Sequence, residues 1–270
     1  MPKDEVYLER LVNEVLSTRK YRYISPVFVR SLAERELSHR RSYKEALKAT
    51  KNKLHQVGGA YQPERMEYQA WLARLLDAYA KPDPEAFPGA CRDIMAFHAS
   101  TRERLPVLDQ FFQVTLAGLP PVRSVLDVAC GLNPLALPWM GLPEGVEYIA
   151  VDIYRDMMDF IAEYLGLLPI HGRTLVADVL EFSLDRHVDL AFILKSIPCL
   201  EQVDKDAGRR LLEGLPASHF LVSFPVYSLG GKQVGMTANY AVRFEELVGG
   251  TGWGVQRFEF QTELAFLVSK

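Results

Sequence analysis

One run in this chain, Ser-Val-Leu-Asp-Val-Ala-Cys-Gly-Leu-Asn-Pro at positions 124–134, permits few folds. Its apolar and β-branched residues up to Val128 predict a short buried strand, and Gly131 predicts the turn that ends it. Asn133 suits the N-cap of a following helix, and Pro134 suits its first position, where the missing N–H would lack a partner anyway. A strand, a glycine turn and a helix in this order present free backbone N–H groups to a nucleotide-like ligand.

An acidic residue at the end of the next predicted strand, Asp152, follows Gly131 by 21 positions. At that distance a carboxylate can accept hydrogen bonds from ribose hydroxyls. The pair therefore indicates an adenosine-containing cofactor. Taken alone, it leaves both a dinucleotide and S-adenosylmethionine (SAM) open.

The chain from residue 122 onward alternates short apolar runs with helical stretches, as a doubly wound α/β sheet does. The pattern predicts strands at 124–129, 147–153, 174–179, 188–194 and 220–225, and helices near 133–140, 155–165, 204–214 and 237–248.

The last residues differ, because two strand-like runs at 252–260 and 263–269 are joined by a very short turn. A terminal antiparallel hairpin on five parallel strands is typical of the Rossmann-like SAM-dependent methyltransferase fold. A dinucleotide dehydrogenase would normally continue with another βαβ half, and the third glycine of its G-x-G-x-x-G motif is missing here. The pattern favours SAM over NAD.

The first hundred residues instead show helical spacing of apolar residues. We expect helices over 5–16, from Ser25-Pro26, from Ser42, over 67–79 and up to about His98. The chain is therefore predicted to divide into an all-helical domain at residues 1–103 and a methyltransferase domain at residues 104–270.

The chain has a net charge of −3 but contains a basic segment. Between Ser17 and Lys53 there are 11 basic residues and only 3 acidic ones. A solvated helical face is one interpretation, and contact with a phosphate backbone is the favoured one. The candidates for RNA contact are Arg19, Lys20, Arg22, Arg40, Arg41, Lys44, Lys48, Lys51 and Lys53.

Other classes of protein find little support in the sequence. It contains no apolar run near 18 residues and begins with charged residues, so we expect a cytoplasmic protein without a membrane partner. Its three cysteines, Cys91, Cys130 and Cys199, are too few and too scattered for a disulfide framework and lack the spacing of a zinc site. We expect buried thiols and no metal.

Three segments resemble a known family. They are His98-Ala-Ser-Thr-Arg-Glu-Arg-Leu105, Val125-Leu-Asp-Val-Ala-Cys-Gly-Leu-Asn-Pro-Leu-Ala136, and a block from Phe224-Pro225 through Ser228-Leu-Gly-Gly231 to Asn239-Tyr240. Together they look like the Arm/Rmt-type 16S rRNA methyltransferases, and the similarity covers most of the chain. That family methylates N7 of guanine-1405 in the decoding-site helix of the 30S ribosomal subunit and confers aminoglycoside resistance.

The resemblance implies a SAM site. Arg104 is expected to contact the methionine carboxylate of SAM, Asp152 its ribose, and Asp178 its adenine amine. The full set of implied cofactor residues is Tyr61, His98, Ala99, Ser100, Thr101, Arg102, Glu103, Arg104, Ala129, Gly131, Asp152, Asp178, Val179 and Leu194.

The implied substrate also sets the chemistry. N7 of guanine has a free lone pair and no proton to lose, so a direct displacement needs orientation rather than a general base. Lys195 and Glu201, just beyond the fourth predicted strand, are the candidate catalytic residues, and a surface ion pair is the alternative. The Pro-Cys pair at Cys199 resembles that of cytosine-C5 methyltransferases, in which a thiolate attacks the base. The supporting motifs of those enzymes are missing here, so we expect Cys199 to be structural.

The sequence leaves other functions open. They are methylation of another decoding-site rRNA base, a NAD-dependent oxidoreductase, and a non-catalytic ribosome-associated protein. The 30S subunit is the expected partner, and no DNA partner is expected.

Overall fold

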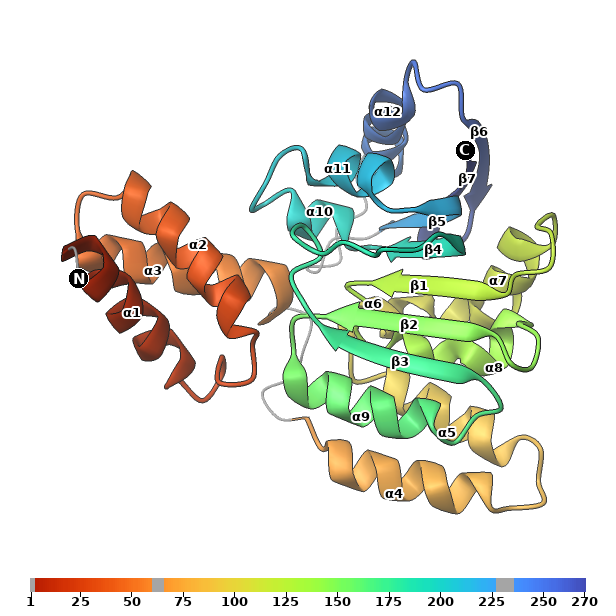
Figure 1. Cartoon of the computed structure of the whole chain (residues 1–270). Coiled ribbons are helices and arrows are strands. Elements are labelled where there is room, and N and C mark those ends of the chain that lie inside the picture. Colours follow the sequence, from red (N-terminus) through yellow and green to blue (C-terminus); the bar gives the residue numbers. More distant parts are fainter. Residues whose placement is uncertain (1–2, 60–65, 227–235) are drawn as a thin grey trace.

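The computed structural model describes residues 3–59, 66–226 and 236–270. In these residues the chain forms a seven-stranded sheet in the order β3-β2-β1-β4-β5-β7-β6 (Figure 1). The strands are β1 (Ser124–Val128), β2 (Glu147–Asp152), β3 (His171–Val176), β4 (Val188–Leu194), β5 (Ala217–Pro225), β6 (Gly254–Glu259) and β7 (Glu263–Ser269).

The pairing of these strands matches the predicted architecture. Strands β1 to β5 are parallel to one another, and β7 lies antiparallel between β5 and β6. The methyltransferase-type sheet with its terminal hairpin is therefore confirmed. Because the parallel strands all end at one edge, the residues that follow β1, β2 and β4 meet there.

Strand β3 begins and ends three residues earlier than predicted, at His171–Val176 instead of 174–179. It is an outer strand of the sheet, and its first three residues are exposed. A half-exposed outer strand lacks the continuous apolar run that marks a buried parallel strand. Asp178 and Val179 consequently lie just beyond the strand, at the edge where the other strands end.

Helices cover both faces of the sheet. One face carries α4 (Tyr68–Tyr79), α5 (Ala86–Met95), α6 (Ala99–Arg104), η2 (Leu105–Val107), α7 (Leu108–Leu116), η3 (Asn133–Ala136), α8 (Leu137–Met140) and α9 (Arg155–Leu165). The other face carries α10 (Ile197–Leu200), α11 (Ala207–Gly214) and α12 (Met236–Val248). Alternate residues of β1 enter the two cores, Val125 on the first face and Leu126 on the second.

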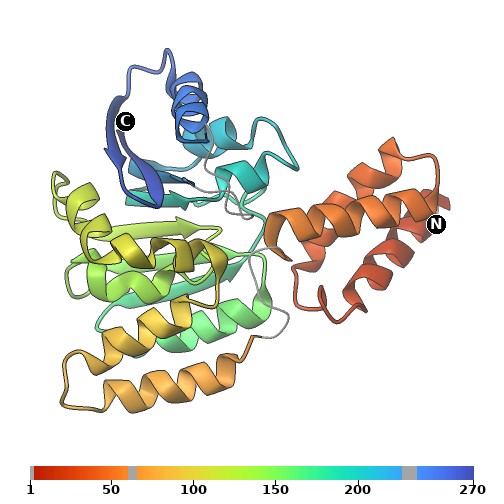
Figure 2. The ribbon, with the colours of Figure 1, turned by 180° about the vertical axis from the view of Figure 1, so that it is seen from behind.

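The N-terminal residues form a separate group of helices, α1 (Lys3–Leu16), α2 (Pro26–His39), α3 (Tyr43–Leu54) and η1 (His55–Gly59), here called the N-terminal bundle. Two predicted helix starts are confirmed: Ser25 Oγ accepts from the Phe28 N–H at 3.5 Å, and Ser42 Oγ accepts from the Glu45 N–H at 3.3 Å. Figures 1 and 2 show this bundle projecting from the side of the sheet at which the parallel strands end.

Helices α4 and α5 do not belong to that bundle. Tyr68 and Trp71 of α4 pack on Phe160 of α9, with ring centroids 5.3 and 5.9 Å from it. These helices therefore share the core of the sheet. The predicted division of the chain at residues 103 and 104 stays a prediction.

No helix in the described part of the chain is both long and apolar enough to cross a membrane.

Candidate active site

A cavity opens where β1, β2 and β4 end. Nine of the predicted cofactor-binding and catalytic residues line it, namely His98, Ser100, Ala129, Gly131, Asp152, Asp178, Val179, Leu194 and Lys195. The predicted residues that do not line it are Ala99, Thr101, Arg102, Glu103, Arg104 and Glu201. Tyr61, and the part of the third family segment at 227–235, lie outside the described residues.

The turn after β1 brings the backbone close to His98. Ala129 and Gly131 both have positive φ values, 51° and 53°. A Cβ on Gly131 would lie 2.9 Å from Cε1 of His98. Glycine is therefore required here both by the left-handed backbone and by the imidazole packed against it.

Asp152 links the turns after β1 and β2. Its Oδ2 accepts from the Gly131 N–H at 3.0 Å, and its Oδ1 accepts from the Ile153 N–H at 2.7 Å. Burial raises the pKa of Asp152, and these N–H groups partly offset that effect. The carboxylate is thus held in one orientation at the cavity wall.

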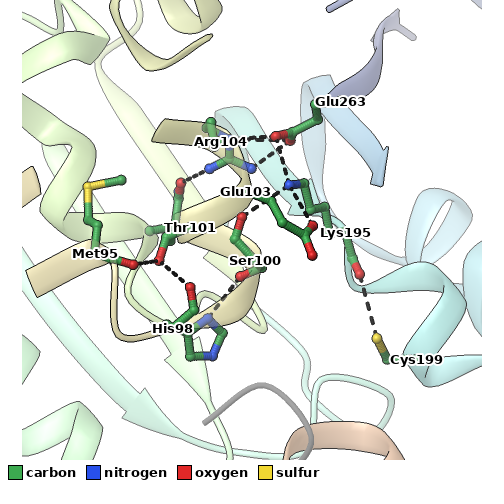
Figure 3. A network of polar contacts seen from close by, with 10 residues as sticks. Met95, His98, Ser100, Thr101, Glu103, Arg104, Lys195, Cys199 and Glu263 are labelled. Carbon is green, nitrogen blue, oxygen red and sulfur yellow. Dashed lines mark hydrogen bonds and ion pairs between the residues drawn. The ribbon is translucent and has the colours of Figure 1, made fainter. Parts of the chain in front are cut away.

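His98 and Ser100 line the cavity from the start of α6 (Figure 3). His98 Nδ1 lies 2.9 Å from Ser100 Oγ. Burial, together with the charges of Arg102 and Lys195, lowers the pKa of His98 to about 4, so its imidazole is neutral at pH 7. Thr101 has a structural contact, because its hydroxyl donates to the Met95 carbonyl at 2.6 Å.

Behind this segment lies a buried cluster of charges (Figure 3). Arg104 Nη2 donates to Glu263 Oε1 at 2.7 Å, and both side chains are almost fully buried. Lys195 Nζ lies 3.2 Å from Glu263 Oε2 and 3.2 Å from Glu103 Oε2. Burial alone would raise the pKa of Glu263, but the charges of Arg104 and Lys195 hold it below its usual value. No local sequence pattern predicts this role for Glu263.

Asn133 extends the cluster toward β1. Its Oδ1 accepts from Arg104 Nη1 at 2.5 Å, and its Nδ2 donates to Asp127 Oδ2 at 2.9 Å. The predicted N-cap role of Asn133 is wrong, because the residue lies inside η3. Its buried amide forms hydrogen bonds with Arg104 and Asp127 instead.

The expected adenine end of the cavity contains Asp178, Val179 and Leu194. Asp178 Oδ1 accepts from the Leu180 N–H at 3.0 Å, and burial raises the pKa of the carboxyl. Val179 and Leu194 are buried apolar residues of the wall. One polar carboxyl beside apolar walls suits a purine with an exocyclic amine.

The two candidate catalytic residues differ in position. Lys195 has positive φ (57°), and Nζ also donates to the Ser100 carbonyl at 3.1 Å. Its three N–H groups thus face three acceptors. Glu201 does not line the cavity, and its Oε1 accepts from Arg243 of α12 at 2.9 Å.

Several lining residues were not predicted. Ser196 has a buried hydroxyl for which the described residues offer no hydrogen-bond partner, although buried polar groups are normally paired. Cys199 is buried, like the other two cysteines, and its thiol lies 3.6 Å from the Lys195 carbonyl. The remaining unpredicted lining residues are Phe28, Val57, Gly58, Ile153, Tyr154, Met157 and Leu200.

The nine basic candidates for RNA contact all lie in the N-terminal bundle or its turns. Arg19, Lys20, Arg22, Arg40, Arg41, Lys44 and Lys48 are exposed, and Lys51 and Lys53 are half-buried. Some have protein partners: Lys20 Nζ lies 2.9 Å from His55 Nδ1, and Arg40 pairs with Glu36 at 2.9 Å.

Comparison with known proteins identifies the family of the chain. Residues 17–267 match the family model described as ribosomal RNA methyltransferase (FmrO). The chain belongs to this family. Its membership removes the oxidoreductase alternative and agrees with a cavity at the carboxyl edge of a methyltransferase sheet.

Individual members of the family resemble the chain over nearly its whole length. It is 37% identical to a 16S rRNA (guanine(1405)-N(7))-methyltransferase of Micromonospora rosea, over 97% of each chain. Among solved structures, it resembles the 16S rRNA methyltransferase RmtF in complex with S-adenosyl-L-homocysteine, with a TM-score of 0.83 and 30% identity over 100% of this chain and 99% of that one. The 16S rRNA methylase RmtB gives a TM-score of 0.80 and 29% identity over 97% and 98%.

The environment of Asp127 leads to a prediction about pH. Burial raises the pKa of Asp127 to about 6, despite hydrogen bonds from Asn133 and Tyr148. Its folded pKa therefore exceeds its unfolded value of about 4, so its stabilising effect is present below pH 4 and is lost as the pH rises through 6. The free energy of unfolding of the wild type, relative to Asp127→Asn, should fall by roughly 2 kcal/mol between pH 4 and pH 7 in urea titrations.

Asp189 provides a control, because its pKa is shifted in the opposite direction. Burial raises the pKa of Asp189, but hydrogen bonds from Arg123 and Ser124 outweigh that effect and lower it. Relative to Asp189→Asn, the wild type should lose stability as the pH falls below about 4. A difference between wild type and Asp127→Asn that does not change with pH would contradict the assignment.

Proposed function

We propose that this protein is a SAM-dependent 16S rRNA (guanine(1405)-N(7))-methyltransferase that acts on the assembled 30S subunit, in the cytoplasm, and confers aminoglycoside resistance. The observation that carries the proposal is the cavity at the ends of β1, β2 and β4, in a chain of the ribosomal RNA methyltransferase family. Relatives with that name are 36–38% identical to the chain over almost all of it, which supports the choice of base and atom.

The residues of the cavity fit SAM. Asp152 provides a fixed carboxylate for the ribose hydroxyls, and Gly131 lets the backbone approach without a Cβ. Asp178 and Val179 would contact the adenine, and Leu194 would pack on it. When bound there, SAM supplies a methyl group already activated by its sulfonium.

The methionine end of the cofactor would lie near His98 and Ser100. Arg104 holds this segment through its bonds to Glu263 and Asn133 and is 1% exposed. We propose that Arg104 acts chiefly by fixing α6. Its direct contact with the methionine carboxylate stays a prediction, since the guanidinium would have to exchange one of these partners.

The target base would enter beside Lys195 and Ser196. The proposed reaction removes no proton from N7, so the residues need only hold the base in line with the methyl group. Lys195, which is saturated by its three acceptors, would shape this wall rather than act as a base. Glu201 would support the wall through Arg243 of α12.

One prediction of the proposed function concerns the cofactor. Asp152→Asn keeps the shape of the side chain but removes its charge and one acceptor oxygen. It should weaken S-adenosyl-L-homocysteine binding by about 1–3 kcal/mol, the range for hydrogen bonds to charged groups, measured by calorimetry. Asp159→Asn, an exposed carboxyl on α9, is the matched control and should bind as the wild type does. Equal affinity in all three proteins would refute the ribose assignment.

The basic residues of the N-terminal bundle are proposed to contact rRNA phosphates. Reversing three exposed charges, with Arg41→Glu, Lys44→Glu and Lys48→Glu, should lower affinity for 30S subunits and reduce its dependence on salt by roughly three units of the log–log slope. Filter binding at several salt concentrations measures both. Affinity for S-adenosyl-L-homocysteine should not change. If the affinity of the wild type for 30S subunits does not depend on salt concentration, the basic residues form a solvated helical face and do not contact phosphates.

The target atom has a direct chemical test. The purified protein should transfer labelled methyl from SAM to 30S subunits, and borohydride and aniline should then cleave the rRNA at guanine-1405. Expression in a susceptible bacterium should give resistance to gentamicin and kanamycin and leave apramycin active, because N7 methylation places a charge where 4,6-disubstituted drugs bind. Apramycin resistance, or reverse-transcriptase arrest at a nearby adenine without cleavage at the guanine, would falsify the N7 assignment.

A further inference from the structure

The N-terminal bundle supplies part of the cavity wall. Phe28 of α2 and Val57 and Gly58 of η1 line the cavity together with Asp152 and Asp178. Phe28 is 3% exposed, so its ring is packed rather than free in solvent. The same group of helices that carries the basic residues therefore also borders the proposed cofactor site.

The bundle is joined to the loop after β2. Ile24 forms an antiparallel bridge with Tyr154. The Ser25 N–H donates to the Ile153 carbonyl at 2.8 Å, and the Arg155 N–H donates to the Tyr23 carbonyl at 2.8 Å. This junction begins directly after Asp152, the proposed ribose ligand.

Gly58 brings η1 against the same loop. A Cβ built on Gly58 would lie 2.5 Å from Tyr154 Oη. Tyr154 itself lines the cavity. The bundle therefore touches the loop both at its backbone and at the ring of Tyr154.

A second junction lies beyond β4. Arg35 Nη1 donates to the Val203 carbonyl at 2.7 Å, and Lys53 Nζ donates to the Gln202 carbonyl. These carbonyls follow α10, whose Cys199 and Leu200 line the cavity. Because β1 lies between β2 and β4, the bundle spans the cavity and contacts the loops on both sides (Figure 1).

We infer that the N-terminal bundle is a structural part of the cofactor site, with Phe28 as a binding residue, and that cofactor binding and rRNA docking are thermodynamically coupled through it. This inference rests on the proposed function, since it takes the cavity as the site of SAM and the bundle as a contact with rRNA. A cofactor that touches the bundle favours its docked position. A 30S subunit that contacts both the bundle and the sheet favours the same position, and coupling between two ligands is reciprocal.

The contact is tested with variants of two neighbouring residues of α2. Phe28→Leu keeps an apolar core residue but removes the ring, and it should weaken S-adenosyl-L-homocysteine binding roughly 5- to 10-fold in calorimetry. Val27→Leu, at a position that is 70% exposed, should leave the affinity unchanged. Circular dichroism and thermal unfolding establish that both variants are folded.

The junction is tested at the surface of the bundle, where folding is least affected. Arg35→Ala removes the contact with Val203 and should weaken S-adenosyl-L-homocysteine binding severalfold. Arg10→Ala removes the same charge from the bundle, at a side chain that stacks on Tyr43, and should have no effect. In the wild type, the same ligand should bind more tightly when 30S subunits are present.

The outcomes separate this inference from the proposed function. A wild type that binds no S-adenosyl-L-homocysteine would overturn both. Wild-type binding that is unchanged in Phe28→Leu and Arg35→Ala would overturn the contact alone. An affinity that is the same with and without 30S subunits would overturn the coupling.

Discussion

The buried carboxylate of Glu263 holds together the parts of the chain on which the site depends. It lies at the start of β7 and pairs with Arg104 of α6 and with Lys195 at the end of β4. Removing either cation would leave a buried charge without full compensation, which is strongly destabilising. The cluster is best understood as a device for orientation, because it fixes α6 so that His98 and Ser100 line the cavity. The terminal hairpin thus contributes to the site without lining it.

The order of the strands determines what can meet at this edge. With β1 between β2 and β4, the loops after all three converge, and ligands bind at such positions in open α/β sheets. In this chain the convergence has a second consequence. The loops on both sides of β1 are also the places where the N-terminal bundle attaches. One feature of topology therefore brings the cofactor residues and the basic helices together.

Much of this arrangement could be predicted from local patterns, and the remainder depends on distant partners. A buried apolar run predicts β1, and the spacing from Gly131 predicts the role of Asp152. The predicted bounds of β3 were three residues too late, because an outer strand lacks such an apolar run. Glu263 stands 159 positions after Arg104, and no pattern of sequence connects them. Phe28 has the spacing of an ordinary core residue of an amphipathic helix. Its place beside Asp152 depends on how the bundle docks.

The charges around the cavity agree with a methyl transfer that needs no proton acceptor. Methylation at N7 leaves the base with the positive charge that the donor carried, so the total charge in the cavity does not change during the proposed reaction. Neutral His98 and fully paired Lys195 add no free cation to oppose that charge, and the carboxyls of Asp152 and Asp178 border the same space. A residue poised to take a proton would have no function in such a step. The site instead shows buried groups that are oriented by fixed partners, as a reaction limited by alignment requires.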